Sequence, residues 1–258
     1  KRNDDCPPWV LNASKIEHNK VKKTVNYENA LLKIYDVPVF YFPKFFHPDP
    51  TVKRQSGFLV PEFSQSNNLG NYISIPYFNA ISNSSDLTFT PRFYDNGKTI
   101  YQTEYRKHNK NSKHELDFSI KNKSIQIFDD NEKKSSTHFF SKSSFDLNLD
   151  NDLSGELDIK IQQTSDDDYL KTYKLKSPLI ESKSSLNTSL DFNLYSDDLS
   201  VKITSETYEN LSLPDSDRYE YIYPSINIIK KFDYFDNGNF SLSSAILNKQ
   251  YQTNIKES

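Results

Sequence analysis

The sequence predicts an all-β protein built from antiparallel strands that follow one another along the chain. Three observations predict this class. Apolar and polar residues alternate with a period of two along most of the chain, whereas apolar residues at helical spacing are scarce. Turn formers separate the alternating runs, as in Asp95-Asn96-Gly97, because Asn-Gly tolerates the positive φ of tight hairpins. The composition is 14% aromatic, too aromatic for a disordered chain, although only 35% is hydrophobic.

The first forty residues have a pattern of their own. Residues 9–16 and 21–34 predict short strands joined by a polar turn at 17–20. A proline-rich stretch follows from Val37, and we expect it to be a linker or hinge between two β modules. The boundary should lie between Pro43 and Lys53, which gives a first module over residues 1–47 and a second over 48–258.

From Gly57 onward we expect about eleven strands in an up-and-down meander. Apolar residues in alternate positions mark one face of these strands. They are Leu87, Phe89, Pro91 and Phe93; Leu116, Phe118 and Ile120; Phe145, Leu147 and Leu149; Leu157, Ile159 and Ile161; Leu190, Phe192 and Leu194; Leu199, Val201 and Ile203; and Phe240 and Leu242. The opposite face carries Ser, Asn, Asp, Lys and Thr. Asp236-Asn237-Gly238 predicts a further hairpin turn.

A sheet with one polar face is found both in soluble sandwiches and in membrane barrels with a wet lumen. Runs near ten residues favour the barrel, because sandwich strands have about five or six residues. Aromatic residues near the run ends are expected to form an interfacial girdle, and the alternative is that they fill an ordinary β core. These aromatics are Phe139, Phe140, Tyr169, Tyr173, Tyr219, Tyr221, Tyr223 and Phe232.

Two prolines stand inside alternating runs, Pro61 in GFLVPEF and Pro76 in YISIPYF. Proline has no backbone N–H, so it cannot donate to a β ladder and is normally confined to edges and bulges. Two neighbouring strands are each weakened at one point, which suggests a seam that opens. The alternative is that both prolines lie at bulges or in a polar rim, where they disturb nothing.

Composition and motifs argue against several function classes. The 32 Lys and Arg are balanced by 35 Asp and Glu, so no basic excess indicates a nucleic-acid partner. The five histidines have no metal-ligand spacing, and no nucleophile elbow, dinucleotide or phosphate-loop motif occurs. We therefore expect no enzyme activity, no metal and no cofactor. The chain contains no Met, and we expect it to be a piece of a longer protein.

A series of short motifs runs in order through the first hundred residues. They are Cys6 shortly before Trp9, Asn29-Ala30, VPVFYFP at 37–43, KRQSGFLVP at 53–61, IPY at 75–77, DLTFTPR at 86–92 and EYR at 104–106. In this order and spacing they resemble the LptD (OstA/Imp) family of lipopolysaccharide-assembly proteins of Gram-negative bacteria. DYLKTY at 168–173 and YIYP at 221–224 resemble the same family more loosely.

The resemblance implies the end of a periplasmic β-jellyroll domain over residues 1–47 and part of a large antiparallel up-and-down transmembrane β-barrel over 48–258. It implies that lipopolysaccharide arrives from an LptA-like periplasmic bridge and enters the outer leaflet between the first and last barrel strands. An LptE-like lipoprotein would plug the barrel in the outer membrane. Pro61 and Pro76 would then lie in the first and second barrel strands and form the lateral gate.

Three further residues take roles from the same resemblance. Cys6 matches a cysteine that pairs with one near the barrel's C-terminus, so its partner is expected outside this chain; a small buried hydrophobe is the alternative. Lys53 and Arg54 are expected to contact lipid phosphates or to be rim charges at the membrane surface. The alternative functions are another outer-membrane barrel, such as a porin or receptor, and a soluble carbohydrate-binding β-sandwich.

Overall fold

A computed structural model describes residues 9–34, 36–52, 54–65, 69–122, 135–149, 152–234 and 238–252. Its regular structure is β-strand except for one short helix, α1 (Tyr169–Tyr173), so the predicted all-β class is confirmed. The described part of the chain holds no helix with the length and apolar character that a bilayer crossing needs. The chain divides into two units, Lys1–Gln55 and Ser56–Ser258. This division lies beyond the expected position between Pro43 and Lys53.

The first unit is a four-stranded antiparallel sheet centred on its third strand. The strands are β1 (Trp9–Asn12), β2 (Lys15–Asn19), β3 (Thr24–Ile34) and β4 (Val37–Pro48). β2 and β1 pair in turn with the two halves of β3, and β4 pairs along its other edge. Asn29 has φ 51° between those halves, and its side chain contacts Ser14 Oγ at 3.0 Å. Asparagine tolerates this left-handed conformation, which lets β3 change partners without a break.

The first part of the proline-rich stretch, residues 37–48, is strand β4, so the expectation of a linker or hinge was wrong for these residues. The described residues between β4 and Gly57 carry no strand. β4 is an edge strand of the described sheet, and edges and bulges are the positions where a sheet accepts proline. Pro38 lies at the register shift between Leu32 and Lys33, and Pro43 lies opposite Asn29. The irregular places in β3 therefore accommodate the prolines of β4.

The expected turn at 17–20 was also misplaced, because 17–19 belong to β2. The turn follows Asn19, whose side-chain Oδ1 accepts bonds from the amides of Val21 at 3.1 Å and Lys22 at 2.9 Å. Lys23 closes the turn with φ 50°. An Asx turn of this kind is a local signal that the polar composition of 17–20 concealed.

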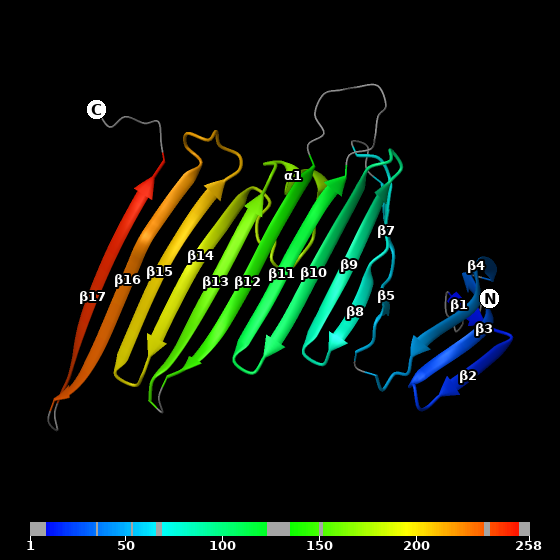
Figure 1. The fold of residues 1–258 in the computed structure, drawn as a ribbon, viewed down its shortest axis with the longest axis horizontal. Coiled ribbons are helices and arrows are strands. Elements are labelled where there is room, and N and C mark those ends of the chain that lie inside the picture. Colours follow the sequence, from blue (N-terminus) through cyan, green and yellow to red (C-terminus); the bar gives the residue numbers. More distant parts are fainter. Residues whose placement is uncertain are drawn as a thin grey trace, which may run out of the picture. The chain divides into compact units, whose positions relative to one another are not determined.

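The second unit is one antiparallel sheet, and from residue 85 onward each strand pairs with its sequence neighbours (Figure 1). Its strands are β5 (Gly57–Phe58), β6 (Glu62–Ser64), β7 (Tyr72–Ser74), β8 (Tyr77–Ser82), β9 (Ser85–Tyr94), β10 (Thr99–Asn109), β11 (Ser112–Asn122), β12 (Ser136–Asn148), β13 (Ser154–Thr164), β14 (Ser185–Tyr195), β15 (Leu199–Asn210), β16 (Tyr219–Tyr234) and β17 (Gly238–Tyr251). β5 and β6 are two parts of one interrupted strand, and so are β7 and β8, since both β7 and β8 pair with β9. We call these the first strand and the second strand. The described chain thus crosses the sheet eleven times as an up-and-down meander.

The connections differ in length between the two ends of this sheet (Figure 1). At one end β8–β9, β10–β11 and β14–β15 are joined by the short turns 83–84, 110–111 and 196–198. At the other end lie the longer connections 165–184 and 211–218. The predicted turn at Asp95-Asn96-Gly97 is present at the same end as these longer connections, with Gly97 at φ 78°. The other predicted hairpin turn includes residues 236 and 237, which lie outside the described residues.

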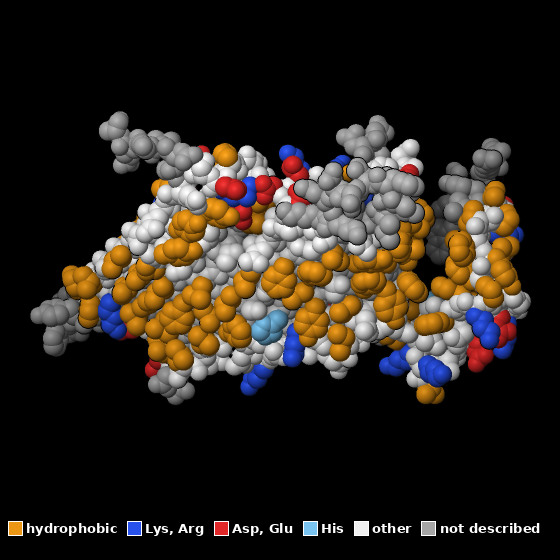
Figure 2. All heavy atoms as spheres, turned by 45° about the horizontal axis from the view of Figure 1, so that its top comes forward, with side chains coloured by type: hydrophobic (Ala, Val, Ile, Leu, Met, Phe, Trp, Pro, Cys, Tyr) orange, Lys and Arg blue, Asp and Glu red, His pale blue; other side chains and the backbone are white. Residues whose placement is uncertain are grey.

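The two faces of the sheet differ in polarity. Residues directly opposite each other in an antiparallel pair share a face. One row of such pairs is Phe145, Leu157, Phe192, Ile203, Ile226 and Ile246. The adjacent row, on the other face, is Lys113, Ser144, Asp158, Asp191, Thr204 and Ser225. Figure 2 shows the apolar face as a band of hydrophobic side chains across the strands, with charged side chains near its ends.

Residues 165–184, which we call the inner segment, fold back against the polar face. The segment includes α1 and supplies Tyr169, Leu170, Tyr173 and Leu175 to the buried core of the second unit. Tyr169 and Tyr173 are therefore core residues, and the expectation that they belong to an interfacial girdle was wrong. Phe140 was misassigned in the same way, since it is fully buried in this core.

Candidate functional site: an interrupted strand pair

The first and second strands are each broken at a proline. Ladder pairing stops after Phe58 and resumes at Glu62, with Pro61 in the gap. In the second strand it stops after Ser74 and resumes at Tyr77, with Ile75 and Pro76 in the gap. Pairing with both neighbours is thus interrupted where the prolines stand.

The structure brings the two prolines to the same level of the sheet. Glu62 pairs with Ser74 on one side of the gap. On its other side the amide of Leu59 donates to the carbonyl of Pro76 at 2.8 Å. Pro61 therefore lies between these contacts, across from the 75–76 gap of its neighbour. We call this boundary between the first and second strands the first seam.

The bond from Leu59 to Pro76 has no return partner. In an antiparallel hydrogen-bonded pair the two residues exchange both N–H···O bonds. The carbonyl of Pro76 accepts from Leu59, but Pro76 has no N–H to donate to the carbonyl of Leu59. The first seam keeps one bond of two at this level.

Few residues pair across the first seam. β5 and β8 have two opposed pairs and β6 and β7 have three, which makes five among the residues that the structure describes. The neighbouring hairpin of β10 and β11 has eleven without a shift. Because each ladder bond contributes about 1 kcal/mol, the first seam is the weaker boundary of the two.

Apolar side chains surround the first seam. Phe58 is 75% exposed, Val60 86% and Phe63 75%. The ring of Phe58 meets that of Tyr77 edge-on, with centroids 5.1 Å apart. An exposed apolar cluster around unpaired backbone suits contact with lipid chains, because removing apolar side chains from water is favourable.

A third proline lies at the same level of the sheet as Pro61 and Pro76, and it was not predicted to do so from the sequence. We call these three residues the proline row. The amide of Ile75 in the second strand donates to the carbonyl of Pro91 in β9 at 3.2 Å. Pro61, Pro76 and Pro91 stand at intervals of fifteen residues, one in each of three successive strands. This regular spacing was the signal in the sequence.

Side chains of the polar face hold the inner segment by its backbone. Arg92 in β9 donates from Nη1 to the carbonyl of Tyr173 at 2.7 Å. Gln102 donates to the carbonyl of Lys176 at 3.1 Å, and Gln162 to that of Leu179 at 3.0 Å. All three donors are buried. A buried carbonyl without a donor is costly, so these bonds fix the position of the inner segment.

A buried polar network lies beneath α1. His138 Nε2 lies 3.0 Å from Asp117 Oδ2, but the geometry of this contact is not that of a hydrogen bond. Ser119 Oγ contacts His138 Nδ1 at 2.6 Å and the Tyr169 hydroxyl at 2.8 Å. Burial raises the pKa of Tyr169 above its ordinary value, so the hydroxyl stays protonated at neutral pH. Within the described ranges no three His, Cys, Asp or Glu side chains form a group that could hold a metal ion.

Other residues singled out by the sequence are less informative. Cys6 and Lys53 lie outside the described residues, so their roles stay predictions. Arg54 is half-buried and takes part in an interaction, so it is not a free cation.

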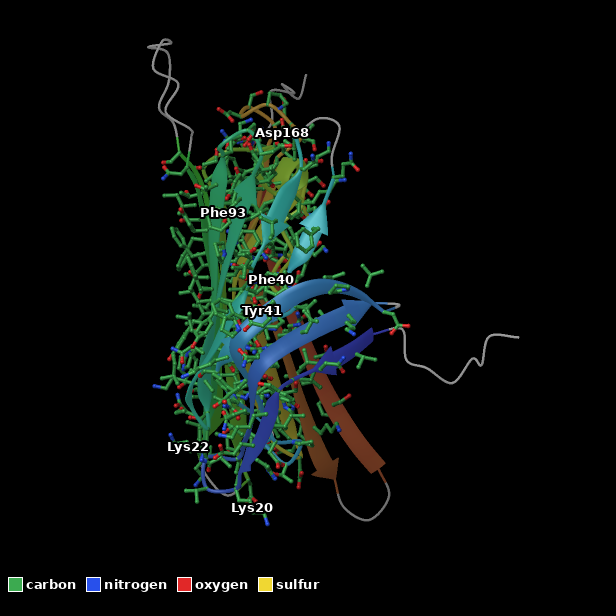
Figure 3. The ribbon with its side chains drawn as sticks, turned by 90° about the vertical axis from the view of Figure 1, so that its right-hand side faces the viewer. Lys20, Lys22, Phe40, Tyr41, Phe93 and Asp168 are labelled. Atoms are coloured by element: carbon green, nitrogen blue, oxygen red, sulfur yellow. The ribbon has the colours of Figure 1, made fainter. Side chains whose placement is uncertain are left out.

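The first unit contributes an aromatic edge. Phe40 and Tyr41 extend from β4 (Figure 3). Both side chains are exposed, as is that of Phe46. The ring of Phe42 lies 4.6 Å from Phe40 and 5.2 Å from Phe45. β4 is thus an apolar edge strand in the described sheet.

These features define an all-β chain whose second unit has the strand order and two-faced character of a β-barrel wall. Among the described residues its first strand and β17 do not pair with each other. Residues 25–136 match the family model described as LptD protein. The LPS-assembly protein LptD of Shewanella oneidensis is 41% identical over 105 residues, which are 39% of this chain and 14% of that protein. Those of Shewanella frigidimarina and Pseudoalteromonas translucida are 38% and 35% identical over 105 and 102 residues.

Over residues 25–136 this chain is therefore similar to LptD proteins, and the resemblance seen in the sequence is confirmed for that part. The alignments span 14% of the length of these three relatives, with 39% to 40% of this chain covered. The first seam, Pro91 and all of β4 lie within the matched residues 25–136.

Proposed function

We propose that this chain is part of an outer-membrane lipopolysaccharide translocon. It would receive lipopolysaccharide from the periplasm and release it into the outer leaflet through a lateral gate between the first and last strands of the barrel. Support comes from relatives that carry the name LPS-assembly protein. The apolar face of the second unit fits a lipid environment, and its polar face fits a wet lumen.

The interrupted pairing at the first seam carries the gate proposal. In hydrocarbon an unsatisfied backbone group costs several kcal/mol, so a barrel strand normally pairs along its whole length. Pro76 removes one donor from the seam, and the gap around Pro61 removes further pairs. The first strand can then separate locally while the rest of the sheet stays paired.

The polar lining and the inner segment suit the sugar portion of the substrate. Sugars need hydrogen-bonding surfaces, and the polar face offers Ser, Thr, Asp and Lys side chains across β11 to β15. Lipid A chains would meet the exposed Phe58, Val60 and Phe63. The two portions of the molecule would thus travel on opposite sides of the first strand.

The partners and placement of the first unit are part of the same proposal. The first unit would be the periplasmic end of a jellyroll fed by an LptA-like bridge, with its apolar edge β4 near the acyl chains. An LptE-like lipoprotein would fill the lumen. Cys6 would pair with a cysteine beyond residue 258, and Lys53 and Arg54 would meet lipid phosphates.

The test is to restore the missing donors in the full-length protein. Pro61→Thr with Pro76→Thr gives both positions an N–H and a residue that favours strands. In proteoliposomes supplied with lipopolysaccharide through the periplasmic proteins, delivery should slow by about fivefold or more, since each restored bond contributes about 1 kcal/mol. Pro214→Thr, in the 211–218 connection, is the matched control and should deliver at the wild-type rate.

Two outcomes separate the proposal from its alternatives. Unchanged delivery by the double variant, with the variant folded and inserted, removes the gate role from these prolines. A full-length protein that conducts small solutes and delivers no lipopolysaccharide would favour a porin. A chain that stays soluble and monomeric without detergent would favour the carbohydrate-binding sandwich.

A further inference from the structure

We infer that the gate has a second seam, between the second strand and β9, and that Pro91 is the positioning residue that keeps it weak. This inference rests on the proposed function. On this view the first and second strands bend together, as a two-stranded flap, when the lipid passes.

The first observation is the backbone contact at the second seam. Ile75 donates to the carbonyl of Pro91, and Pro91 has no N–H with which to return a bond to Ile75. The same one-sided bond joins Leu59 to Pro76 at the first seam. Two adjacent boundaries therefore lose one bond each at the same level of the sheet.

The second observation is the contrast across β9. On the side of the second strand, pairing comes in blocks of three and five residues, and the register shifts between Ala80 and Ser82. On the side of β10, nine consecutive residues pair without a shift. β9 is also tied to the inner segment through Arg92. β9 thus belongs to the fixed wall, and the second strand to the part that moves.

The third observation is where the flap is fastened. At the end with the longer connections, the backbone N–H of Asn71 donates to Asp95 Oδ2 at 2.9 Å. The side-chain Nδ2 of Asn96 donates to the backbone carbonyl of Leu69 at 3.0 Å. At the opposite end the turn 83–84 joins β8 to β9 covalently. The proline row lies between these two attachments. A flap held at both ends and weakened in the middle bows outward without detaching.

The variant that tests this is Pro91→Thr in the full-length protein. The new N–H points towards Ile75, because the N–H and carbonyl of a strand residue face the same neighbour. We expect slower hydrogen exchange over residues 72–82 and delivery of purified lipopolysaccharide slowed by about fivefold. If Pro91 only fits the local backbone, the threonine would loosen the region and exchange would become faster, which would overturn the inference.

A reversible crosslink gives a second, independent measurement. Phe78 and Thr88 are opposed in β8 and β9. They form a non-hydrogen-bonded pair, with Cα atoms about 4.5 Å apart, which is within disulfide range. Phe78→Cys with Thr88→Cys would lock the second seam, and delivery should fall under oxidation and recover on reduction. The control lock, Phe89→Cys with Thr103→Cys between β9 and β10, should leave delivery unchanged.

The outcomes distinguish this inference from the gate itself. If the Phe78–Thr88 lock leaves delivery intact while Pro61→Thr with Pro76→Thr still slows it, the second seam does not open and the gate stands. If the lock stops delivery and the control lock does not, the flap is supported. Equal loss with both locks would mean that general stiffening of the sheet matters, which also overturns the flap.

Discussion

Arg92 Nη1 donates to the backbone carbonyl of Tyr173 at 2.7 Å, joining residues 81 positions apart in the chain. This bond ties β9, which borders the proline row, to the segment that covers the polar face. The guanidinium of Arg92 also lies 4.5 Å from the ring centroid of Tyr72 in the second strand. One side chain thus contacts the wall, the inner segment and the second strand.

Arg92→Ala should release the inner segment. A hydrogen bond from a charged donor contributes about 1.5–3 kcal/mol, and the variant leaves the buried carbonyl of Tyr173 unpaired. Limited proteolysis of the membrane-inserted protein should therefore cut within 165–184 roughly tenfold faster. Lys202→Ala, on the same face in β15, is the control. Equal cutting of both variants would show that Arg92 does not hold the segment.

Tyr169 gives the inner segment a dependence on alkaline pH. Burial raises the pKa of Tyr169 above its unfolded value near 10, so the neutral hydroxyl stabilises the packed segment fully below that value. This stabilisation is lost as the pH rises above about 10 towards the raised folded pKa. Protease protection of 165–184 should therefore fall at alkaline pH in the wild type.

Tyr169→Phe is the matched variant for that titration. It cannot ionise, and it loses the contact with Ser119, at a cost of about 1 kcal/mol at neutral pH. Its protection should start lower and decline less between pH 9 and 12 than that of the wild type. Parallel curves for the two proteins would contradict the assignment.

The two faces of the sheet can be tested with neighbouring residues of β14. Phe192 lies in the apolar row and Asn193 is on the opposite face. Lysine on a lipid-facing position costs up to about 2–4 kcal/mol, less towards the membrane interfaces, whereas lumen positions tolerate charge. Phe192→Lys should reduce folding into bilayers by that amount, measured by denaturant titration, and Asn193→Lys should change it little. A larger loss from Asn193→Lys would reverse the faces.

The strands of the second unit were predictable because their signal is local. Alternation fixes which side chains share a face, and the row from Phe145 to Ile246 follows from it directly. The interruptions of the first and second strands were also predictable, because a proline cannot donate a hydrogen bond to a β ladder.

The errors have a common physical origin in tertiary contacts. Tyr169 and Tyr173 follow an acidic turn after a strand, which is also how a girdle residue looks in sequence. The buried core and the distant donors Arg92, Gln102 and Gln162 hold the inner segment against the sheet, and neither can be read from the local sequence. The prolines of β4 led to the wrong prediction of a linker over residues 37–48. The left-handed Asn29 that accommodates Pro43 belongs to another strand, so the sequence of β4 does not show it.

Hydrogen exchange of the full-length protein in bilayers tests the central claim most directly. We predict that amides in residues 57–64 and 72–82 exchange at least about tenfold faster than those in 99–122, because five pairs hold the first seam and eleven hold β10 to β11. Pro61→Thr with Pro76→Thr should narrow this difference. Equal protection of the two regions in the wild type would contradict a weakened seam and, with it, the lateral gate.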